Sequence, residues 1–210
     1  MGSLLIAALL YYRDNPFVAG ELAVSTLQSP RKNPSGFLIA SAGPLVGAAL
    51  LTPLVPLFYG RFRSSAPVSA TIGAGALMFS VLAFCANGIL SLLSYTGRLH
   101  ADLATVSFAC AVMAVLCLLH AGRRHNLVLE RARHPTIDVL LWLNYISLLM
   151  LFTFFVGPDY VGLTNPLEFV DVNPYHIIGA SEVLFTVLAF GSLLLLISVA
   201  DPESRRHAHT

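Results

Sequence analysis

Residues 66–94 read APVSATIGAGALMFSVLAFCANGILSLLS, and no side chain in this stretch is charged. The hydrocarbon core of a bilayer is about 30 Å thick, so a helix that spans it needs about 20 mostly apolar residues. In lipid every backbone polar group has to bond within its own segment, which makes such a run a helix and not an open strand. The stretch therefore predicts a transmembrane helix and makes lipid the solvent for this part of the chain.

Similar apolar runs follow one another along the whole chain, separated by charged or proline-rich breaks. Hydrophobic residues make up 56% of the sequence and charged residues 11%, against about 25% charged residues in soluble domains. The first run is too short to span without tilting or local thinning of the bilayer, and it is the weakest of the spans. We therefore predict an all-α integral membrane protein, a six-helix bundle that forms one transmembrane domain over residues 1–210. The predicted helices occupy approximately residues 1–17, 36–59, 66–94, 101–120, 138–157 and 176–200.

The basic residues divide unevenly between the two sides of this bundle. One set of loops holds four of them, Arg13, Arg31, Lys32 and Arg98, and the other, richer set holds eight. Because an excess of Lys and Arg marks cytoplasmic loops, we expect the richer set and both termini to be cytoplasmic. Anionic lipid headgroups are sufficient partners for these loops, so nucleic acid is not an expected partner. The richer set consists of Arg61, Arg63, Arg123, Arg124, Arg131, Arg133, Arg205 and Arg206.

Small and polar residues inside the predicted helices indicate how the helices pack. Gly43 and Gly47 form a GxxxG pair, and such small-residue faces usually let two membrane helices approach closely. Asn87 is a polar group at depth in its helix and needs a hydrogen-bond partner. Cys110 and Cys117 lie seven residues apart on one helix face, and no CxxC spacing for a metal or a redox site is present.

Ionisable residues gather on the predicted outer side, and we take Glu21, His100, Asp102, His176 and Glu182 as candidate ligand-binding residues. Asp102 is expected in the first turn of its helix, where an acid suits the helix dipole. His100 and His176 begin their helices at one membrane level, and Glu182 lies about 9 Å deeper along its helix. Ionisable groups within a span usually face the bundle interior.

Several interpretations of these residues remain open. They could form a polar pocket for a lipid headgroup or a small amphiphile. They could instead activate water in an intramembrane, lipid-modifying hydrolase with His100 or His176 as general base. A haem held by the two histidines is disfavoured by their spacing, so no cofactor and no metal is predicted. The remaining interpretation is structural, in which the polar groups pair with each other, cap helices and hold the loops.

Three short motifs resemble one known group of membrane proteins. These are Asn15–Pro16–Phe17–Val18 to Glu21–Leu22–Ala23 with Asn33–Pro34, His100 with Leu103–Ala104 and Ser107–Phe108, and His176–Ile177–Ile178–Gly179–Ala180–Ser181–Glu182. Together they resemble the FRAG/DRAM/SFK group of six-span membrane proteins and their prokaryotic relatives of unknown function. The resemblance implies six helices, cytoplasmic termini and a long first outer loop. It also adds Asn33 to the candidate ligand-binding residues.

The leading prediction is a non-enzymatic multi-pass membrane protein with a polar pocket on the outer side that binds a lipid or small amphiphile. The hydrolase is the first alternative, and an accessory or structural subunit of a larger membrane complex is the second. Expected partners are membrane lipids, together with a second copy of the chain or a partner in a membrane complex.

Overall fold

The computed structural model describes residues 2–15, 27–94, 98–128, 135–151 and 186–197. Within these ranges the chain forms helices joined by turns, which confirms the all-α prediction. The helices are α1 (Gly2–Asp14), α3 (Phe37–Leu51), α4 (Leu54–Phe62), α5 (Pro67–Leu92), α6 (Arg98–Val128), α7 (Pro135–Leu151) and an unlabelled helix, Thr186–Ile197.

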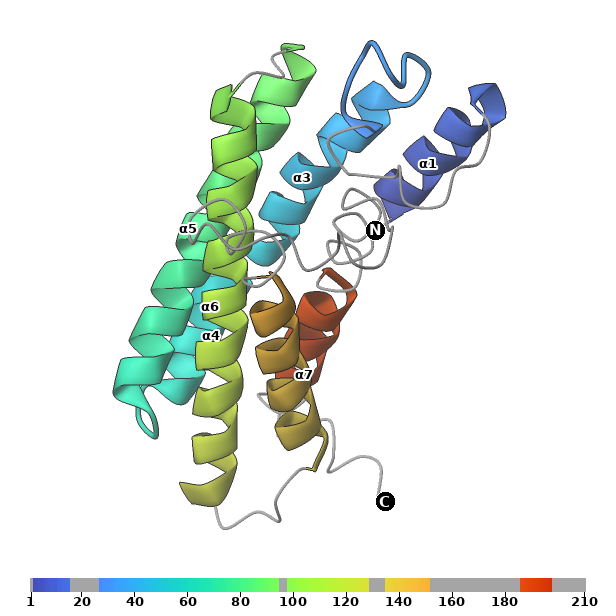
Figure 1. Cartoon of the computed structure of the whole chain (residues 1–210). Coiled ribbons are helices and arrows are strands. Elements are labelled where there is room, and N and C mark those ends of the chain that lie inside the picture. The colour runs from blue at the N-terminus through green and yellow to red at the C-terminus, as the bar shows by residue number, and fades with distance from the viewer. Residues whose placement is uncertain (1, 16–26, 95–97, 129–134, 152–185, 198–210) are drawn as a thin grey trace, which may run out of the picture.

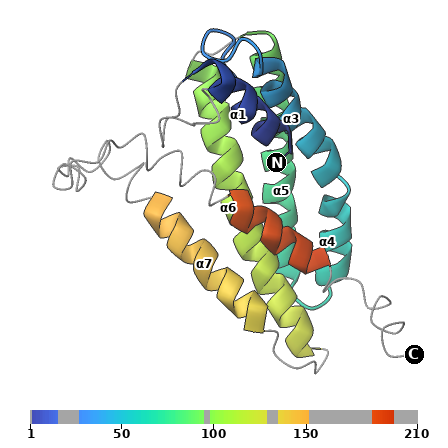
Figure 2. The ribbon, with the colours of Figure 1, turned by 90° about the vertical axis from the view of Figure 1, so that its right-hand side faces the viewer.

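Helices α5 and α6 form the centre of the bundle and lie side by side along their lengths (Figure 1). Helices α3 and α4 pack on α5, and α1 packs on α3. On the other side, α7 and the helix Thr186–Ile197 lie against α6, as the rotated view of Figure 2 shows. We call the end where α4 ends and α5 begins the Phe62 end, and the end where α5 ends and α6 begins the His100 end.

Three helices in the described part of the chain are long and apolar enough to cross a membrane. They are Phe37–Phe62, Pro67–Leu92 and Asp102–His125. The first combines α3 and α4, which are interrupted at Thr52–Pro53 because prolines at 53 and 56 lack the N–H groups that would continue the helix. An integral multi-pass membrane protein is consistent with these helices.

The other predicted spans are described only in part. Helix α1 has 13 residues, which corresponds to a length of about 20 Å, and this agrees with its being the weakest span. The apolar helices Thr136–Ile146 and Thr186–Ile197 are shorter than a span. The remainder of the predicted helices at 138–157 and 176–200 lies outside the described residues.

Two predicted helix starts are three residues too late, and one of them is that of α7, which begins at Pro135 and not at residue 138. Helix α6 begins at Arg98 and not near residue 101, so Asp102 lies beyond the first turn, and no acid stands in that turn. The apolar run identified the spanning part of the helix but not its polar extension, since a helix continues past the lipid while its backbone bonds are made. Asp138, by contrast, lies in the first turn of α7.

The main core lies toward the Phe62 end and is almost entirely apolar. It joins α4, α5, α6, α7 and the helix Thr186–Ile197. Glycines allow the helices to meet there: a Cβ at Gly73 would lie 2.9 Å from Leu118 Cγ, and a Cβ at Gly122 would lie 2.7 Å from Leu196 Cδ2. Close approach at small residues is the usual way in which membrane helices pack. The largest fully buried apolar side chains of the main core are Phe58, Phe62, Leu118, Leu119, Ile137 and Leu196.

Helix α1 has a small core of its own. Its buried side chains are Ala7, Ala8 and Tyr11, which pack with Leu27 and Ala40. This group of five residues, the α1 cluster, is separate from the main core. The helix is therefore attached at the edge of the bundle and not through its centre.

The described basic residues follow the predicted division. Arg61 and Arg123 belong to the Phe62 end, whereas Arg13, Arg31 and Lys32 belong to the His100 end (Figure 1). The two sets thus occupy opposite ends of the bundle. That the Phe62 end is cytoplasmic stays a prediction.

Candidate functional site

The structure describes three of the six candidate residues. Asn33 and His100 are buried at the His100 end, whereas the side chain of Asp102 is exposed. His100 and Asp102 are two residues apart on α6 and so point to different sides of that helix. Glu21, His176 and Glu182 lie outside the described residues.

Asn33 joins helix α1 to the turn that precedes α3. Its side-chain Nδ2 donates to the carbonyl oxygens of Ala7, at 3.2 Å, and Leu27, at 3.1 Å. Its Oδ1 accepts from the backbone N–H of Gly36 at 3.0 Å. A side chain at position 36 would collide with this amide, since a Cβ there would lie 2.7 Å from Asn33 Nδ2. Both amide hydrogens of Asn33 are therefore engaged, which is typical of a structural role.

His100 is held to the last turns of α5. Its Nδ1 lies 3.3 Å from Ser91 Oγ, and Ser91 Oγ donates to the backbone carbonyl oxygen of Asn87 at 2.9 Å. Because the single hydroxyl proton of Ser91 is directed to that carbonyl, His100 Nδ1 carries a proton and donates to Ser91 Oγ. Burial lowers the pKa of His100 below its ordinary value of 6.5, so the neutral imidazole is favoured.

This hydrogen-bond direction bears on the hydrolase interpretation. A serine nucleophile is activated when it gives its proton to the histidine base. Here Ser91 accepts from His100 and donates to the backbone, and its side chain is fully buried. The pair therefore has the geometry of an interhelix contact and not that of a nucleophile with its base.

The structure does not unite Asn33 and His100 in one hydrogen-bonded site. Asn33 bonds to α1 and to its own turn, whereas His100 bonds to α5. The two residues share an end of the bundle but serve different contacts. A shared polar pocket that also contains Glu21, His176 and Glu182 stays a prediction.

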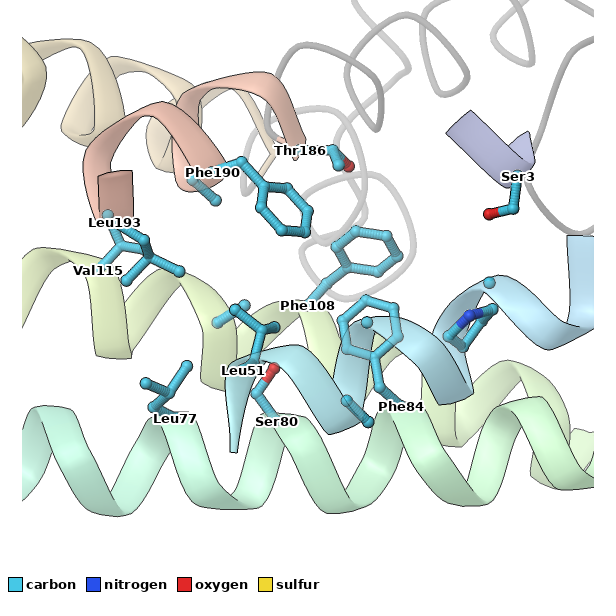
Figure 3. Close-up of a pocket in the computed structure, with 16 residues that line it drawn as sticks. Ser3, Leu51, Leu77, Ser80, Phe84, Phe108, Val115, Thr186, Phe190 and Leu193 are labelled. Carbon is cyan, nitrogen blue, oxygen red and sulfur yellow. The ribbon is translucent and has the colours of Figure 1, made fainter. Parts of the chain in front are cut away.

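A cavity that the sequence did not predict lies in the middle of the bundle. Its volume is about 120 Å³, and none of the six candidate residues lines it. Figure 3 shows the rings of Phe84, Phe108 and Phe190 around this space, with Thr186 above them and Ser3 to their right. The described part of the lining has no ionisable side chain; it consists of Ser3, Gly43, Pro44, Gly47, Ala48, Leu51, Leu77, Ser80, Phe84, Phe108, Ala111, Val115, Thr186, Ala189, Phe190 and Leu193.

The GxxxG pair of α3 explains part of the cavity. A Cβ at Gly43 would collide with Ser3 of α1, so this glycine provides the close helix contact that the motif predicts. At Gly47 an added Cβ would meet nothing within 4 Å, and this glycine lines the cavity. Both glycines therefore line the cavity, but only Gly43 also packs against a neighbouring helix. The sequence contained this signal, but a GxxxG pair alone does not distinguish the two roles.

The polar side chains of the cavity wall are few. Ser80 on α5 donates its hydroxyl proton to the carbonyl oxygen of Ser107 on α6 at 3.0 Å. The rings of Phe84 and Phe108 meet edge to face one turn further toward the His100 end, with centroids 5.9 Å apart. The wall therefore presents mainly carbon, which suits a hydrocarbon chain and does not suit a charged headgroup.

Metal-binding residues do not gather in the described part of the chain. Those ranges contain no group of three or more His, Cys, Asp or Glu residues that could hold an ion. Cys85, Cys110 and Cys117 are free thiols on helices α5 and α6. The haem alternative requires His176, which lies outside the described residues.

Comparison with known proteins gives no family assignment. No protein-family model, curated protein or solved structure matches the chain. The resemblance to FRAG/DRAM/SFK proteins therefore stays a prediction that rests on its short motifs.

Proposed function

We propose that this protein is a non-enzymatic multi-pass membrane protein that binds a lipid or small amphiphile. The observation that carries the proposal is the cavity of about 120 Å³ between α3, α5, α6 and the helix Thr186–Ile197. Apolar cavities of similar size in proteins stay dry and take up small apolar ligands. A bilayer offers hydrocarbon chains at high concentration, so such a space has an available occupant.

Polar groups near one end of the cavity support an amphiphile over a purely apolar ligand. The helix Thr186–Ile197 lines the cavity from its first described residue, Thr186. The sequence predicts that this helix starts near residue 176, in which case Glu182 would stand one turn before Thr186. With His100 and Asp102 on α6, the predicted polar pocket would then adjoin the apolar space.

The arrangement around His100 disfavours a serine nucleophile, whereas the alternative in which a histidine activates water is tested by turnover. The Ser91–His100 hydrogen bond runs in the direction opposite to that of an activated serine. The exposed carboxylate of Asp102 points away from this pair, as its position two residues further along α6 requires.

A cavity-filling variant with a matched control tests the proposal. Gly47→Leu places a side chain in the cavity, whereas Gly75→Leu adds the same side chain on α5 at a position that is equally open but does not line the cavity. Both proteins would be purified in mild detergent, and retained lipid would be measured by native mass spectrometry. We expect the wild type and Gly75→Leu to retain a lipid or amphiphile that Gly47→Leu has lost.

The outcomes separate the proposal from its alternatives. A wild type that retains and takes up no amphiphile, or equal retention by the two leucine variants, would contradict it. Release of fatty acid from a panel of phospholipids and ceramides would favour the hydrolase. A stable protein partner that co-purifies with an empty cavity would favour the complex subunit.

A further inference from the structure

Three buried polar atoms near the cavity have no hydrogen-bond partner among the residues that the structure describes, and one of them, Ser107 Oγ on α6, lies beside the lining residue Phe108. The other two are Ser41 Oγ on α3 and Asn87 Oδ1 on α5, which stand at the same end of the cavity. The Ser41 residue is 0% exposed and Asn87 is 5% exposed. An unpaired polar group in such surroundings is destabilising, because it has lost its hydrogen bonds to water without replacing them. Their presence is therefore unfavourable unless something else bonds to them.

Both atoms stand just beyond the cavity on its His100 side. Ser41 precedes the lining residue Pro44 by three positions, and Asn87 follows the lining residue Phe84 by three positions. Three residues of helix correspond to about 4.5 Å. The two helices touch at this level, because a Cβ at Gly88 would lie 3.1 Å from the carbonyl oxygen of Ser41. The polar atoms thus come from two helices that meet at one end of an apolar space.

The chemistry of the two atoms defines what they could bind. An amide oxygen only accepts hydrogen bonds, so Asn87 Oδ1 requires a donor, while the hydroxyl of Ser41 donates or accepts. Among the described residues no ionisable side chain lines the cavity, and the described ionisable residue His100 is bonded to Ser91, one turn beyond Asn87 on α5. A charged headgroup would lose its hydration there without an opposite charge to compensate it.

We infer that the ligand is an uncharged amphiphile, part of whose hydrocarbon chain occupies the cavity and whose hydroxyl or amide group bonds to Asn87 Oδ1 and Ser41 Oγ. This inference rests on the proposed function and narrows its ligand class. Long-chain alcohols, monoacylglycerols and lipid amides belong to that class. Fatty acids and quaternary ammonium amphiphiles with the same chain do not.

Competition between probes of equal chain length tests this selectivity. Wild-type protein in nanodiscs would be loaded with a pyrene-labelled long-chain alcohol, which would then be displaced by dodecanol, monolauroylglycerol, laurate or dodecyltrimethylammonium. We expect dodecanol and monolauroylglycerol to compete at least about tenfold better than the two charged amphiphiles. A single hydrogen bond contributes about 0.5–1.5 kcal/mol, so Asn87→Leu should weaken dodecanol binding about three- to tenfold and leave binding of dodecane unchanged.

The stability of the ligand-free variants shows whether Asn87 already has a partner elsewhere in the chain. Asn87→Leu replaces an unpaired amide with an apolar group of similar size, so the unfolding temperature should stay the same or rise. Ser41→Ala should also lower dodecanol binding, whereas Ser69→Ala, on α5 near the Phe62 end, should not. A marked fall in the unfolding temperature of Asn87→Leu would contradict the inference, because the amide would then be paired within the protein.

The failures of the two proposals are distinguishable. If no uncharged or charged amphiphile binds the wild type, the proposed function fails. If laurate binds as tightly as dodecanol, or if Asn87→Leu keeps the preference for the hydroxyl, amphiphile binding stands and the assignment of the ligand class is wrong.

Discussion

The two halves of the bundle are held together by different means. Toward the Phe62 end most of the large buried side chains are aromatic and aliphatic, and helices meet at Gly73 and Gly122. Two polar contacts accompany this packing, Ser65 Oγ with His125 Nδ1 at 3.1 Å and Asn144 Nδ2 with Ser192 Oγ at 3.0 Å. Toward the His100 end Asn33, Asn87 and His100 are buried among the helices and their turns. In lipid, apolar packing depends on shape alone, whereas each buried polar group requires a specific partner. The half toward the Phe62 end is therefore suited to a fixed scaffold, and we call it the scaffold half. The half toward the His100 end, the polar half, is suited to a site whose stability depends on whether a ligand occupies it.

The cavity lies where these two halves meet. Leu77 and Val115 of the main core line one part of it, and the Phe84–Phe108 pair lines the part that faces the polar half. An amphiphile has the same division between an apolar and a polar part. The contrast between the halves can be tested by perturbing each in a way that the other would not feel.

The largest effect is expected from the scaffold half. Gly73→Leu would force a side chain into Leu118 Cγ and Cys117 Cβ, which lie 2.9 and 3.1 Å from a Cβ at this position. Overpacking of this kind is destabilising by about 3 kcal/mol. Gly75→Leu, two residues along the same helix, would meet nothing within 4 Å and should unfold near the wild-type temperature. Thermal unfolding in detergent measures the stability of both variants. Equal stability of Gly73→Leu and Gly75→Leu would show that the close contact of α5 with α6 at Gly73 is not rigid.

A smaller and more local effect is expected from the polar half. Asn33→Leu removes the hydrogen bonds to the Ala7 and Leu27 carbonyls and to the Gly36 N–H. Unpaired buried groups should weaken the attachment of α1 by about 2 kcal/mol. The α1 cluster should open while the main core stays closed.

Cysteine labelling can separate these two responses. A background without the three native cysteines would carry either Ala40→Cys, in the α1 cluster, or Ala70→Cys, in the main core; both alanines are fully buried. Asn33→Leu should speed maleimide labelling at position 40 and leave position 70 slow. Faster labelling at both positions would show that the two halves open together.

The pH dependence of stability should report on the polar half. Burial lowers the pKa of His100 from its ordinary value of 6.5, so the unfolded chain takes up a proton more readily than the folded protein. Stability is then complete above pH 6.5 and falls as the pH drops below 6.5 toward the folded-state pKa. His100→Asn keeps a donor for Ser91 without titrating, and its unfolding temperature should change less between pH 7.5 and pH 5. His120 is exposed on the same helix, and His120→Asn should keep the wild-type dependence of stability on pH. A flattened dependence in this variant would mean that His100 is not its main source.

The same division explains how far the sequence could be interpreted. The continuity and length of the apolar runs predicted the helices at 66–94 and 36–59 to within a few residues, because lipid imposes a strong requirement on every residue of a span. They misplaced the start of α6, whose polar first turns lie beyond that requirement. The cavity was not predictable, since Gly43 and Gly47 look alike in sequence and differ only in what lies opposite them. The sequence indicated that Asn87 needs a hydrogen-bond partner, but only the structure showed that its Oδ1 has none among the described residues.

The smallest effect should come from the boundary of the scaffold half. Arg123 Nε and Asp138 Oδ1 lie 2.9 Å apart and connect α6 to α7, but their side chains are 37% and 32% exposed. Such a pair contributes less than about 1 kcal/mol, and Asp138 also interacts favourably with the N-terminus of α7 by a similar amount. A double-mutant cycle with Arg123→Gln and Asp138→Asn isolates the ion pair, because the helix-dipole contribution is the same in both arms of the cycle. We expect a coupling energy of about 0.5 kcal/mol that shrinks in high salt as the charges are screened; a coupling of several kcal/mol would mean that charge, and not apolar packing alone, fixes α7 to the scaffold half.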